Sequence, residues 1–333
     1  MKRIAVIGAG SWGTTVASIA AAGTDTVLWA RRRELAEAIN ETRVNAEYVP
    51  ELELPNRLAA TDDLTEAVNG VDAVVMAVPS HGFRDVFTRL APSIRRDTPI
   101  VSLTKGIEQD SLARMTEVIA AVSPHHDHAL TGVLTGPNLA AEIVAGQPTA
   151  AVVALPDQEA AGSMQRLLMS PSFRVYTNDD VAGCELAGAL KNVMAIASGM
   201  SDGLGFGDNT RATLLTRALA ELSRLGVALG GRPETFAGLA GMGDLIATCS
   251  SVRSRNHLVG YHLAQGRDLD DIVAEMNMVA EGIKTTRSVL GLAEQTGVDM
   301  PIATHVGMVL DAEITPREGV MSLMTREAKA ESA

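Results

Sequence analysis

The sequence predicts an α/β protein in which a doubly wound parallel sheet is followed by an all-helical C-terminal domain. Short apolar β runs alternate with helical patterns up to about residue 178, a glycine-rich turn follows the first β run, and helical periods alone follow residue 178. We therefore expect a first domain of residues 1–178 and a second of residues 179–333, with a tight interface because no flexible linker separates them. A chain of 333 residues is long enough for both cores.

The first predicted β run, residues 4–7, leads directly into Gly8-Ala9-Gly10-Ser11-Trp12-Gly13, and a helical pattern follows over residues 14–22. Gly8 permits the tight turn, Gly10 lets the backbone approach a pyrophosphate, and Gly13 lets the helix pack on the strand. The helix N-terminus then faces the phosphates. Because the motif lies in the first strand–turn–helix of the chain, it predicts a Rossmann-like dinucleotide-binding domain rather than a glycine turn without a ligand.

The second β run, residues 26–30, ends at Arg31, Arg32 and Arg33. A site specific for NAD would place an acidic residue here, about 20 residues after the glycine motif. Guanidinium groups suit the 2′-phosphate of NADP instead. The alternative is that these arginines are a solvated start to the next helix, and we expect at least one of the three to face water.

Further β runs and helices continue the alternation. The β runs are predicted at residues 72–78, 100–106, 129–134, 149–155 and 173–176. Helical patterns begin near Ser80 and cover residues 111–122. Residues 45–55 contain Pro50 and Pro55 and are expected to form an irregular loop.

Several polar or turn-forming residues lie at the carboxyl ends of these predicted strands. They are Pro79, Lys105 and Gly136-Pro137-Asn138. Ligands of doubly wound sheets bind beyond the carboxyl ends of the strands. Lys105 is therefore a candidate to hold an anion, the alternative being an ordinary surface lysine.

A single lysine lies in the middle of an apolar helix predicted over residues 184–200. One helical turn away on either side of Lys191 are Ala187, Gly188, Met194 and Ala195. Small neighbours leave room for a ligand beside the ammonium group, and apolar neighbours favour the neutral amine that acid–base catalysis requires. The alternative is a lysine whose long side chain reaches solvent from a core helix.

The helical half contains a second cluster of polar and small residues, which covers residues 238–250 and continues to Ser254-Arg255-Asn256. Asp244 and Thr248 share one face of a helix. Arg255-Asn256 offers a forked cation beside an amide, which suits a phosphate. Asp244 has an alternative role as the cap of its own helix.

Composition excludes several function classes. A net charge of −12 argues against a nucleic acid as partner, although a small anion can bind where positive charge gathers locally. No apolar run reaches the length of a membrane helix, so we expect no membrane insertion. The two cysteines form no CxxC pair, which indicates a reduced, cytoplasmic protein. His125-His126-Asp127-His128 lies in a polar connection without a scaffold, so we expect no metal site.

The ordered set of motifs closely resembles the bacterial-type NAD(P)-dependent glycerol-3-phosphate dehydrogenases over nearly the whole chain. The segments that carry the resemblance are 6–13, 102–108, 135–140, 185–192, 241–244, 254–256 and 279–282. The glycine motif is shared by many families, whereas this ordered set is specific. Asn138 departs from the Ser or Thr common in the family, and Ala141 stands where many members have Lys.

The resemblance implies reversible, NAD(P)H-dependent reduction of dihydroxyacetone phosphate to sn-glycerol 3-phosphate, which feeds phospholipid synthesis. It also implies that Lys191 donates and accepts the proton. Cofactor contacts are then expected from the glycine motif (Gly8, Gly10, Gly13) and from Ser11, Trp12, Arg31, Arg32, Lys105, Ala140, Arg255, Val279 and Glu281. Contacts to the phosphorylated substrate are expected from Lys105, Gly136, Asn138, Lys191, Asp244, Ser254, Arg255 and Asn256.

Two other functions are compatible with parts of the pattern. A related dehydrogenase of the same architecture would act on a hydroxy acid and would need a carboxylate clamp. A non-catalytic sensor of nicotinamide nucleotides would keep the first 140 residues or so, but it would have no use for Lys191 or Arg255-Asn256. A homodimer is compatible with the sequence.

Overall fold

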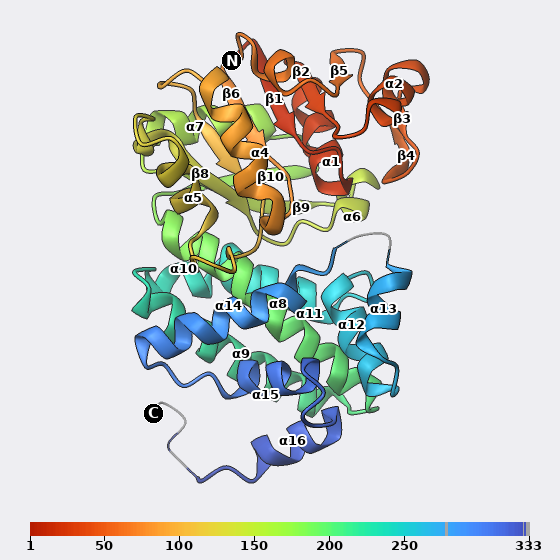
Figure 1. Ribbon diagram of the computed structural model, residues 1–333, viewed down its shortest axis with the longest axis vertical. Helices are drawn as coiled ribbons and strands as arrows, with labels where there is room; N and C mark the ends of the chain where they lie inside the picture. Colours follow the sequence, from red (N-terminus) through yellow and green to blue (C-terminus); the bar gives the residue numbers. More distant parts are fainter. Residues whose placement is uncertain (277–278, 329, 331–333) are drawn as a thin grey trace.

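The computed structural model describes residues 1–276, 279–328 and 330. Figure 1 shows a sheet covered by helices in the upper part and a group of helices in the lower part, with the long helix α8 (Val181–Gly203) running from the junction into the lower part. The strand β10 (Phe173–Asn178) ends just before α8 begins. The predicted α/β class with a helical C-terminal part is confirmed.

The main sheet has eight strands in the order β10-β9-β8-β7-β6-β1-β2-β5. Their bounds are β1 (Arg3–Ile7), β2 (Asp25–Trp29), β5 (Leu58–Thr61), β6 (Ala73–Met76), β7 (Ile100–Ser102), β8 (Thr131–Thr135), β9 (Thr149–Ala154) and β10. β1 pairs in parallel with both β2 and β6. The strand order therefore reverses at β1, and the crevice beyond the carboxyl ends of β1 and β6 is where such sheets bind ligands.

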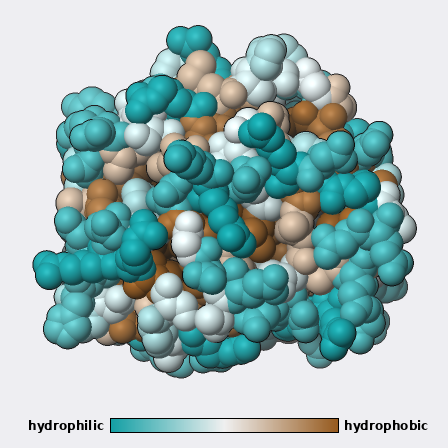
Figure 2. All heavy atoms as spheres, turned by 90° about the horizontal axis from the view of Figure 1, so that it is seen from above, coloured by the Kyte–Doolittle hydropathy of each residue, from teal (hydrophilic) through white to brown (hydrophobic). Residues whose placement is uncertain are grey.

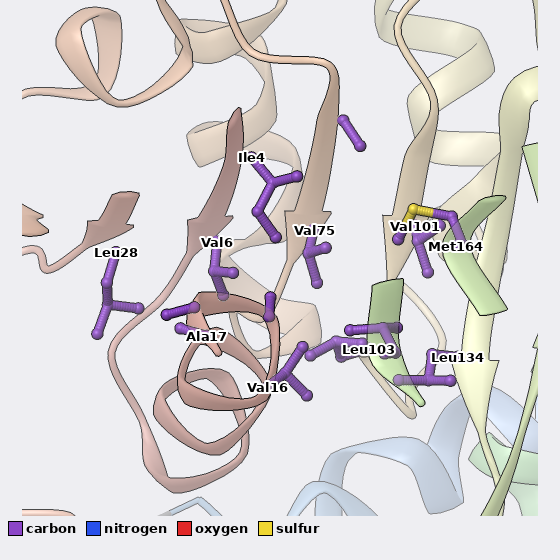
Figure 3. Close-up of a cluster of buried hydrophobic side chains, with 14 of the residues drawn as sticks. Ile4, Val6, Val16, Ala17, Leu28, Val75, Val101, Leu103, Leu134 and Met164 are labelled. Carbon is purple, nitrogen blue, oxygen red and sulfur yellow. The ribbon is translucent and has the colours of Figure 1, made fainter. Parts of the chain in front are cut away.

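Both faces of the sheet are buried. Ile4 and Val6 of β1 belong to one hydrophobic cluster, while Ala5 and Ile7 belong to another on the opposite face. Figure 3 shows Val16 of α1 within the first cluster, together with Ile4 and Val6 of β1. The covering helices are α1 (Ser11–Ala21), α2 (Arg33–Thr42), α3 (Leu64–Val68), α4 (Phe83–Leu90), α5 (Met115–Val122), α6 (Ala140–Val144) and α7 (Gln158–Leu168). Strands buried on two faces explain the nearly continuous apolar runs of the sequence.

The sheet is mainly parallel, as predicted, but the sequence did not indicate one antiparallel pair. β8 and β9 are antiparallel neighbours, with Val133 paired to Ala154. A parallel pair needs a crossover long enough to return to the starting edge of the sheet. The only helix between these two strands is α6, whose five residues are too few to span the sheet.

Residues 45–55 are not an irregular loop. β3 (Val44–Asn45) and β4 (Val49–Glu53) form an antiparallel hairpin. Pro50 is tolerated in β4 because both strands of a two-stranded ribbon are edges, where a missing N–H leaves no partner unsatisfied. The sequence prediction also missed β5, a short edge strand whose two alanines have weak β propensity.

The lower part contains α8 and the helices that surround it. Their bounds are α9 (Asp208–Ala228), α10 (Pro233–Ala237), α11 (Asp244–Ser250), α12 (Arg255–Ala264), α13 (Leu269–Glu275), α14 (Glu281–Thr296), α15 (Pro301–Leu310) and α16 (Pro316–Met324). α12 lies very close to α8. A Cβ atom added to Gly199 would come within 1.9 Å of the His257 carbonyl oxygen, and one added to Gly260 within 2.0 Å of the Ile196 carbonyl oxygen.

The surface is mainly hydrophilic on the face that Figure 2 shows, with apolar residues visible in smaller areas between polar ones. Within the described part of the chain, no helix combines the length and apolar character needed to cross a lipid bilayer.

Candidate active site

Lys191 lies in the buried middle of α8, with a relative exposure of 5%. Its Nζ donates a hydrogen bond to Thr248 Oγ1 at 2.5 Å and forms an ion pair with Asp244 Oδ1 at 3.0 Å. The alternative of a lysine reaching solvent is wrong, because the side chain is enclosed between α8 and α11 and its ammonium is held there by two polar partners. Burial of an ammonium is tolerated where it is paired and hydrogen-bonded.

Asp244 holds two ammonium groups at once. Its Oδ2 accepts a hydrogen bond from Lys105 Nζ at 2.7 Å, while Oδ1 faces Lys191. The alternative that Asp244 caps its own helix is wrong. The N-cap of α11 is Gly243, at the end of a short π-helix (Leu239–Gly243), and the Asp244 carboxylate is turned toward the lysines.

Lys105 joins the sheet to the helical part. Besides Asp244, its Nζ donates to Gly136 O at 3.0 Å and to Asn138 Oδ1 at 2.6 Å. Burial lowers the pKa of Lys105 from 10.5 to about 8, against the opposing effect of Asp244, and the Lys191 charge lowers it further. Lys105, which was predicted to hold an anion at a strand end, thus has three hydrogen-bond partners within the protein.

Asn138 contributes only half of its amide to this cluster. Its Nδ2 is buried and has no hydrogen-bond partner among the described residues. A buried donor without a partner is costly, which points to a ligand atom as the missing acceptor. Asn138, the departure from the family pattern, thus brings both an acceptor for Lys105 and a spare donor.

A second series of hydrogen bonds runs behind the lysines. Asn192 Nδ2 donates to Lys105 O at 2.9 Å, Asn256 Nδ2 donates to Asn192 Oδ1 at 2.9 Å, and Gly282 N donates to Asn256 Oδ1 at 2.9 Å. Asn256 was predicted as a substrate contact, and most of its amide is engaged inside the protein. Sequence reasoning assigned no role to Asn192, although a second polar residue beside Lys191 in a buried helix was a usable signal.

The N-terminus of α12 carries two further predicted residues. Ser254 is the N-cap, and its side chain accepts a hydrogen bond from His257 N at 3.3 Å. Arg255 is exposed, and its Nη1 donates to Val279 O at 2.5 Å. A guanidinium has five N–H donors, so Arg255 keeps others for a ligand.

The glycine motif has the shape that a pyrophosphate needs. Gly8 has φ +122°, and a Cβ atom there would lie 2.6 Å from Ala77 O. A Cβ atom at Gly13 would lie 2.0 Å from Gly8 O, so the first turn of α1 packs directly on the loop. Gly10 has no atom within 4 Å of its virtual Cβ position, which leaves open space at the N-terminus of α1. The residues present therefore fit a dinucleotide.

The other predicted cofactor residues lie around this region and across the junction. Trp12 packs edge-on against Phe173, with ring centroids 6.1 Å apart, and Ala140 is the first residue of α6. Glu281 begins α14 and accepts hydrogen bonds from Ser80 N at 3.0 Å and Ser80 Oγ at 2.5 Å. Glu281 thus ties the helical part to the segment that follows β6.

The three arginines after β2 have different surroundings. Arg31 is exposed, and Arg32 forms an ion pair with Glu47. Arg33 forms an ion pair with Glu37 one turn along α2, and its side chain is 73% exposed. The prediction that at least one arginine faces water is confirmed.

Chemically, the centre combines two ammonium groups with one carboxylate, all close to buried strand ends. Positive charge therefore predominates locally in a chain of net charge −12, which favours a small anion at this point. Among residues 1–276, 279–328 and 330, no three His, Cys, Asp or Glu side chains gather closely enough to hold a metal ion.

Comparisons with known proteins agree with this arrangement. Residues 3–161 match the family described as "NAD-dependent glycerol-3-phosphate dehydrogenase N-terminus", and residues 180–321 match the corresponding C-terminus family. The chain is 53% identical to a glycerol-3-phosphate dehydrogenase of Sphingopyxis alaskensis over 97% of this chain and 96% of the relative. It is 52% identical to that of Geobacter sulfurreducens over 99% of both chains.

Among solved structures, glycerol-3-phosphate dehydrogenase from Coxiella burnetii is similar with a TM-score of 0.92 and 37% identity, covering 98% of this chain and 99% of the other. The sequence matches span both parts of the chain, and the structural match covers the sheet together with the helices. The chain therefore belongs to the family of NAD(P)-dependent glycerol-3-phosphate dehydrogenases.

Proposed function

We propose that Lys191 donates the proton to the carbonyl oxygen of dihydroxyacetone phosphate during its reduction to sn-glycerol 3-phosphate, and removes that proton in the reverse reaction. The observation that carries this proposal is the buried ammonium of Lys191, fixed by Asp244 at 3.0 Å and Thr248 at 2.5 Å. A proton donor that is held in one place and shielded from water stabilises a developing alkoxide.

The nicotinamide cofactor, NADPH or NADH, supplies the hydride when it is bound. The glycine motif and the N-terminus of α1 would hold its pyrophosphate, because Gly10 leaves the backbone accessible there. Trp12, Ala140, Val279 and Glu281 are proposed to line the rest of the site.

Lys105 and Arg255 are proposed to supply the positive charge that holds the substrate, with the spare Nδ2 of Asn138 as a further donor. Asp244 would orient Lys191 through the ion pair at 3.0 Å and hold Lys105 beside it. Gly136, Ser254 and Asn256 would act by shaping this surface: Gly136 O accepts from Lys105, Ser254 caps α12, and Asn256 connects α12 to α8.

A substrate screen tests the function as a whole. Oxidation of NADPH should be rapid with dihydroxyacetone phosphate and very slow with unphosphorylated ketones and with keto acids. Turnover of a keto acid at a similar rate would instead favour a hydroxy-acid dehydrogenase. Tight binding of NADPH without turnover of any ketone would favour a nucleotide sensor.

The alkaline side of the pH profile should report Lys105. Because its pKa is lowered to about 8, the ammonium is charged below that pH and loses its proton as the pH rises through it. We therefore expect kcat/KM for dihydroxyacetone phosphate to fall above about pH 8, measured between about pH 6 and about pH 10. In Lys105→Arg the guanidinium stays charged, so the fall should move to higher pH. An unchanged profile in this variant would show that another group controls it.

Arg31 and Arg32 should favour NADPH. Replacing both with glutamine should weaken NADPH about tenfold to a hundredfold relative to NADH, since a charge-assisted contact contributes roughly 1.5–3 kcal/mol. Dissociation constants for the two cofactors, measured by fluorescence titration, check this. Arg33→Gln is the matched control, because Arg33 pairs with Glu37 and is 73% exposed. Equal weakening of both cofactors would contradict the assignment.

We also propose a domain division, a cellular location and an oligomeric state for the enzyme. We infer that residues 1–178 form the dinucleotide-binding domain and residues 179–333 the substrate domain, because β10 ends at Asn178 and α8 begins at Val181. We further propose a cytoplasmic enzyme that supplies phospholipid synthesis and works as a homodimer. Val227 and Met321 are exposed apolar residues of the helical part, and light scattering after gel filtration would test whether two copies associate.

A further inference from the structure

The β3–β4 hairpin is braced against the glycine motif. Asn45 is fully buried, and its Nδ2 donates hydrogen bonds to Ala9 O at 2.9 Å and to Thr14 Oγ1 at 2.8 Å. Ser11 Oγ donates to Tyr48 O at 3.0 Å. Both ends of the turn between β3 and β4 are thus fixed relative to the loop that would hold the pyrophosphate.

Glu47 lies in this turn and forms an ion pair with Arg32. The hydrogen bond from Arg32 is the largest cause that lowers the pKa of Glu47, so this carboxylate is ionised at neutral pH. Both side chains are about half exposed, at 49% for Arg32 and 45% for Glu47, so a ligand can reach either of them. The pair places a cation and an anion together at the end of β2, where the ribose of a dinucleotide is expected.

The two charges would have opposite effects on the two cofactors. A 2′-phosphate attracts a guanidinium and is repelled by a carboxylate, whereas a 2′-hydroxyl can donate a hydrogen bond to a carboxylate. An acidic residue near the ribose is what a site for NAD normally provides. In this chain the acidic group comes from the hairpin and not from the end of β2.

We propose that Glu47 is a specificity-determining residue, which competes with the 2′-phosphate of NADPH for Arg32 and so keeps NADH usable. This inference rests on the proposed role of Arg31 and Arg32. When NADPH binds, Arg32 exchanges the Glu47 carboxylate for the 2′-phosphate. When NADH binds, the pair stays together and Glu47 faces the ribose hydroxyls.

Binding of two cofactor fragments tests the competition without catalysis. Calorimetric titration of Glu47→Gln with 2′,5′-ADP should give a dissociation constant about threefold to thirtyfold lower than for the unmodified protein, because the competing ion pair and the repulsion are both removed. The dissociation constant of 5′-AMP, which lacks only the 2′-phosphate, should stay the same or rise. The ratio of kcat/KM for NADPH to that for NADH should increase in parallel.

The matched control is Glu37→Gln, which removes one negative charge from the neighbouring Arg33 pair on α2. This control should leave the preference between the two fragments unchanged. Both glutamates are exposed at the surface, so folding should not be affected, and thermal denaturation would verify this. An equal increase in affinity for 2′,5′-ADP in Glu37→Gln would overturn the proposal, because it would show a general effect of net charge.

A double-mutant cycle of Glu47 and Arg32 separates competition for Arg32 from simple repulsion between Glu47 and the 2′-phosphate. In an Arg32→Gln background, Glu47→Gln should increase the affinity for 2′,5′-ADP by only a small part of its original effect. The reason is that there is no Arg32 guanidinium left to release. A gain of the same size in both backgrounds would overturn the competition mechanism. If Arg31 and Arg32 prove irrelevant to NADPH, the proposed arginine role fails first. If they matter and Glu47→Gln changes nothing, only the present inference fails.

Discussion

Replacing Lys191 with alanine should lower kcat for the reduction of dihydroxyacetone phosphate by at least about 100-fold, the usual contribution of general acid catalysis. The dissociation constant of NADPH should change little, because Lys191 lies in α8 and not in the glycine motif. Folding should be retained, since the Asp244 carboxylate keeps its ion pair with Lys105 at 2.7 Å. Steady-state kinetics, cofactor titration and thermal denaturation of the variant would measure these three properties.

Lys191→Arg separates proton transfer from positive charge. A guanidinium keeps its proton at working pH and so cannot act as the acid. It is also too bulky for a buried site in which Lys191 has a relative exposure of 5% and close contacts to Asp244 and Thr248. The arginine variant should therefore remain as inactive as the alanine variant. Activity near that of the unmodified enzyme would contradict the assignment of Lys191.

Replacing Arg255 with alanine should cost about 2–4 kcal/mol of the transition-state stabilisation measured by kcat/KM for dihydroxyacetone phosphate, as expected when one partner of a charge pair that bound substrate shields from water is removed. This corresponds to about a thirtyfold to thousandfold loss. Arg255 is well placed for such a contact, because the adjacent Asn256 is hydrogen-bonded to Asn192, the neighbour of Lys191. Arg255 is the first residue of α12, and its guanidinium has further N–H donors besides the one that donates to Val279 O.

Substrate truncation shows whether the contact is direct. Unphosphorylated dihydroxyacetone should be a very poor substrate, since no phosphate positions its carbonyl group. Arg255→Ala should lower its already slow turnover much less than that of dihydroxyacetone phosphate, so the two losses should be far from additive. Arg253→Ala is the control, because Arg253 is exposed two residues earlier in the chain. If both substrates lose the same factor, Arg255 serves the cofactor or the fold, and Lys105 becomes the candidate for the phosphate.

Much of the architecture could be predicted because its causes are local. The positive φ of Gly8 and the close packing at Gly13 are satisfied only by glycine. The glycine motif therefore predicts the conformation of the turn between β1 and α1. The apolar β runs are continuous because both faces of the sheet are buried. Lys191 stood out as a lysine in the middle of an apolar helix, but its spacing alone left a lysine that reaches solvent as an alternative, and the resemblance implied its role.

Other features depend on partners that are distant in the sequence. No local rule indicates that Asp244 and Lys105 meet, or that Asp244 is the first residue of α11 rather than its cap and holds two lysines. The roles of Asn192 and Asn256 arise because α8 and α12 pack at glycines, which brings their amides to 2.9 Å. Pairing between side chains that are distant in the sequence depends on how whole helices and strands pack. Local sequence patterns carry no information about that packing.

The sequence by itself determined the class of fold, the dinucleotide loop and the identity of the buried lysine, because each follows from backbone conformation or from burial along a short segment. Only the tertiary structure decided that β9 runs antiparallel to β8, that residues 45–55 contain a hairpin, and that Glu47 faces Arg32. The physical reason is that strand direction and ion pairing depend on where the chain returns in space, which no single segment specifies.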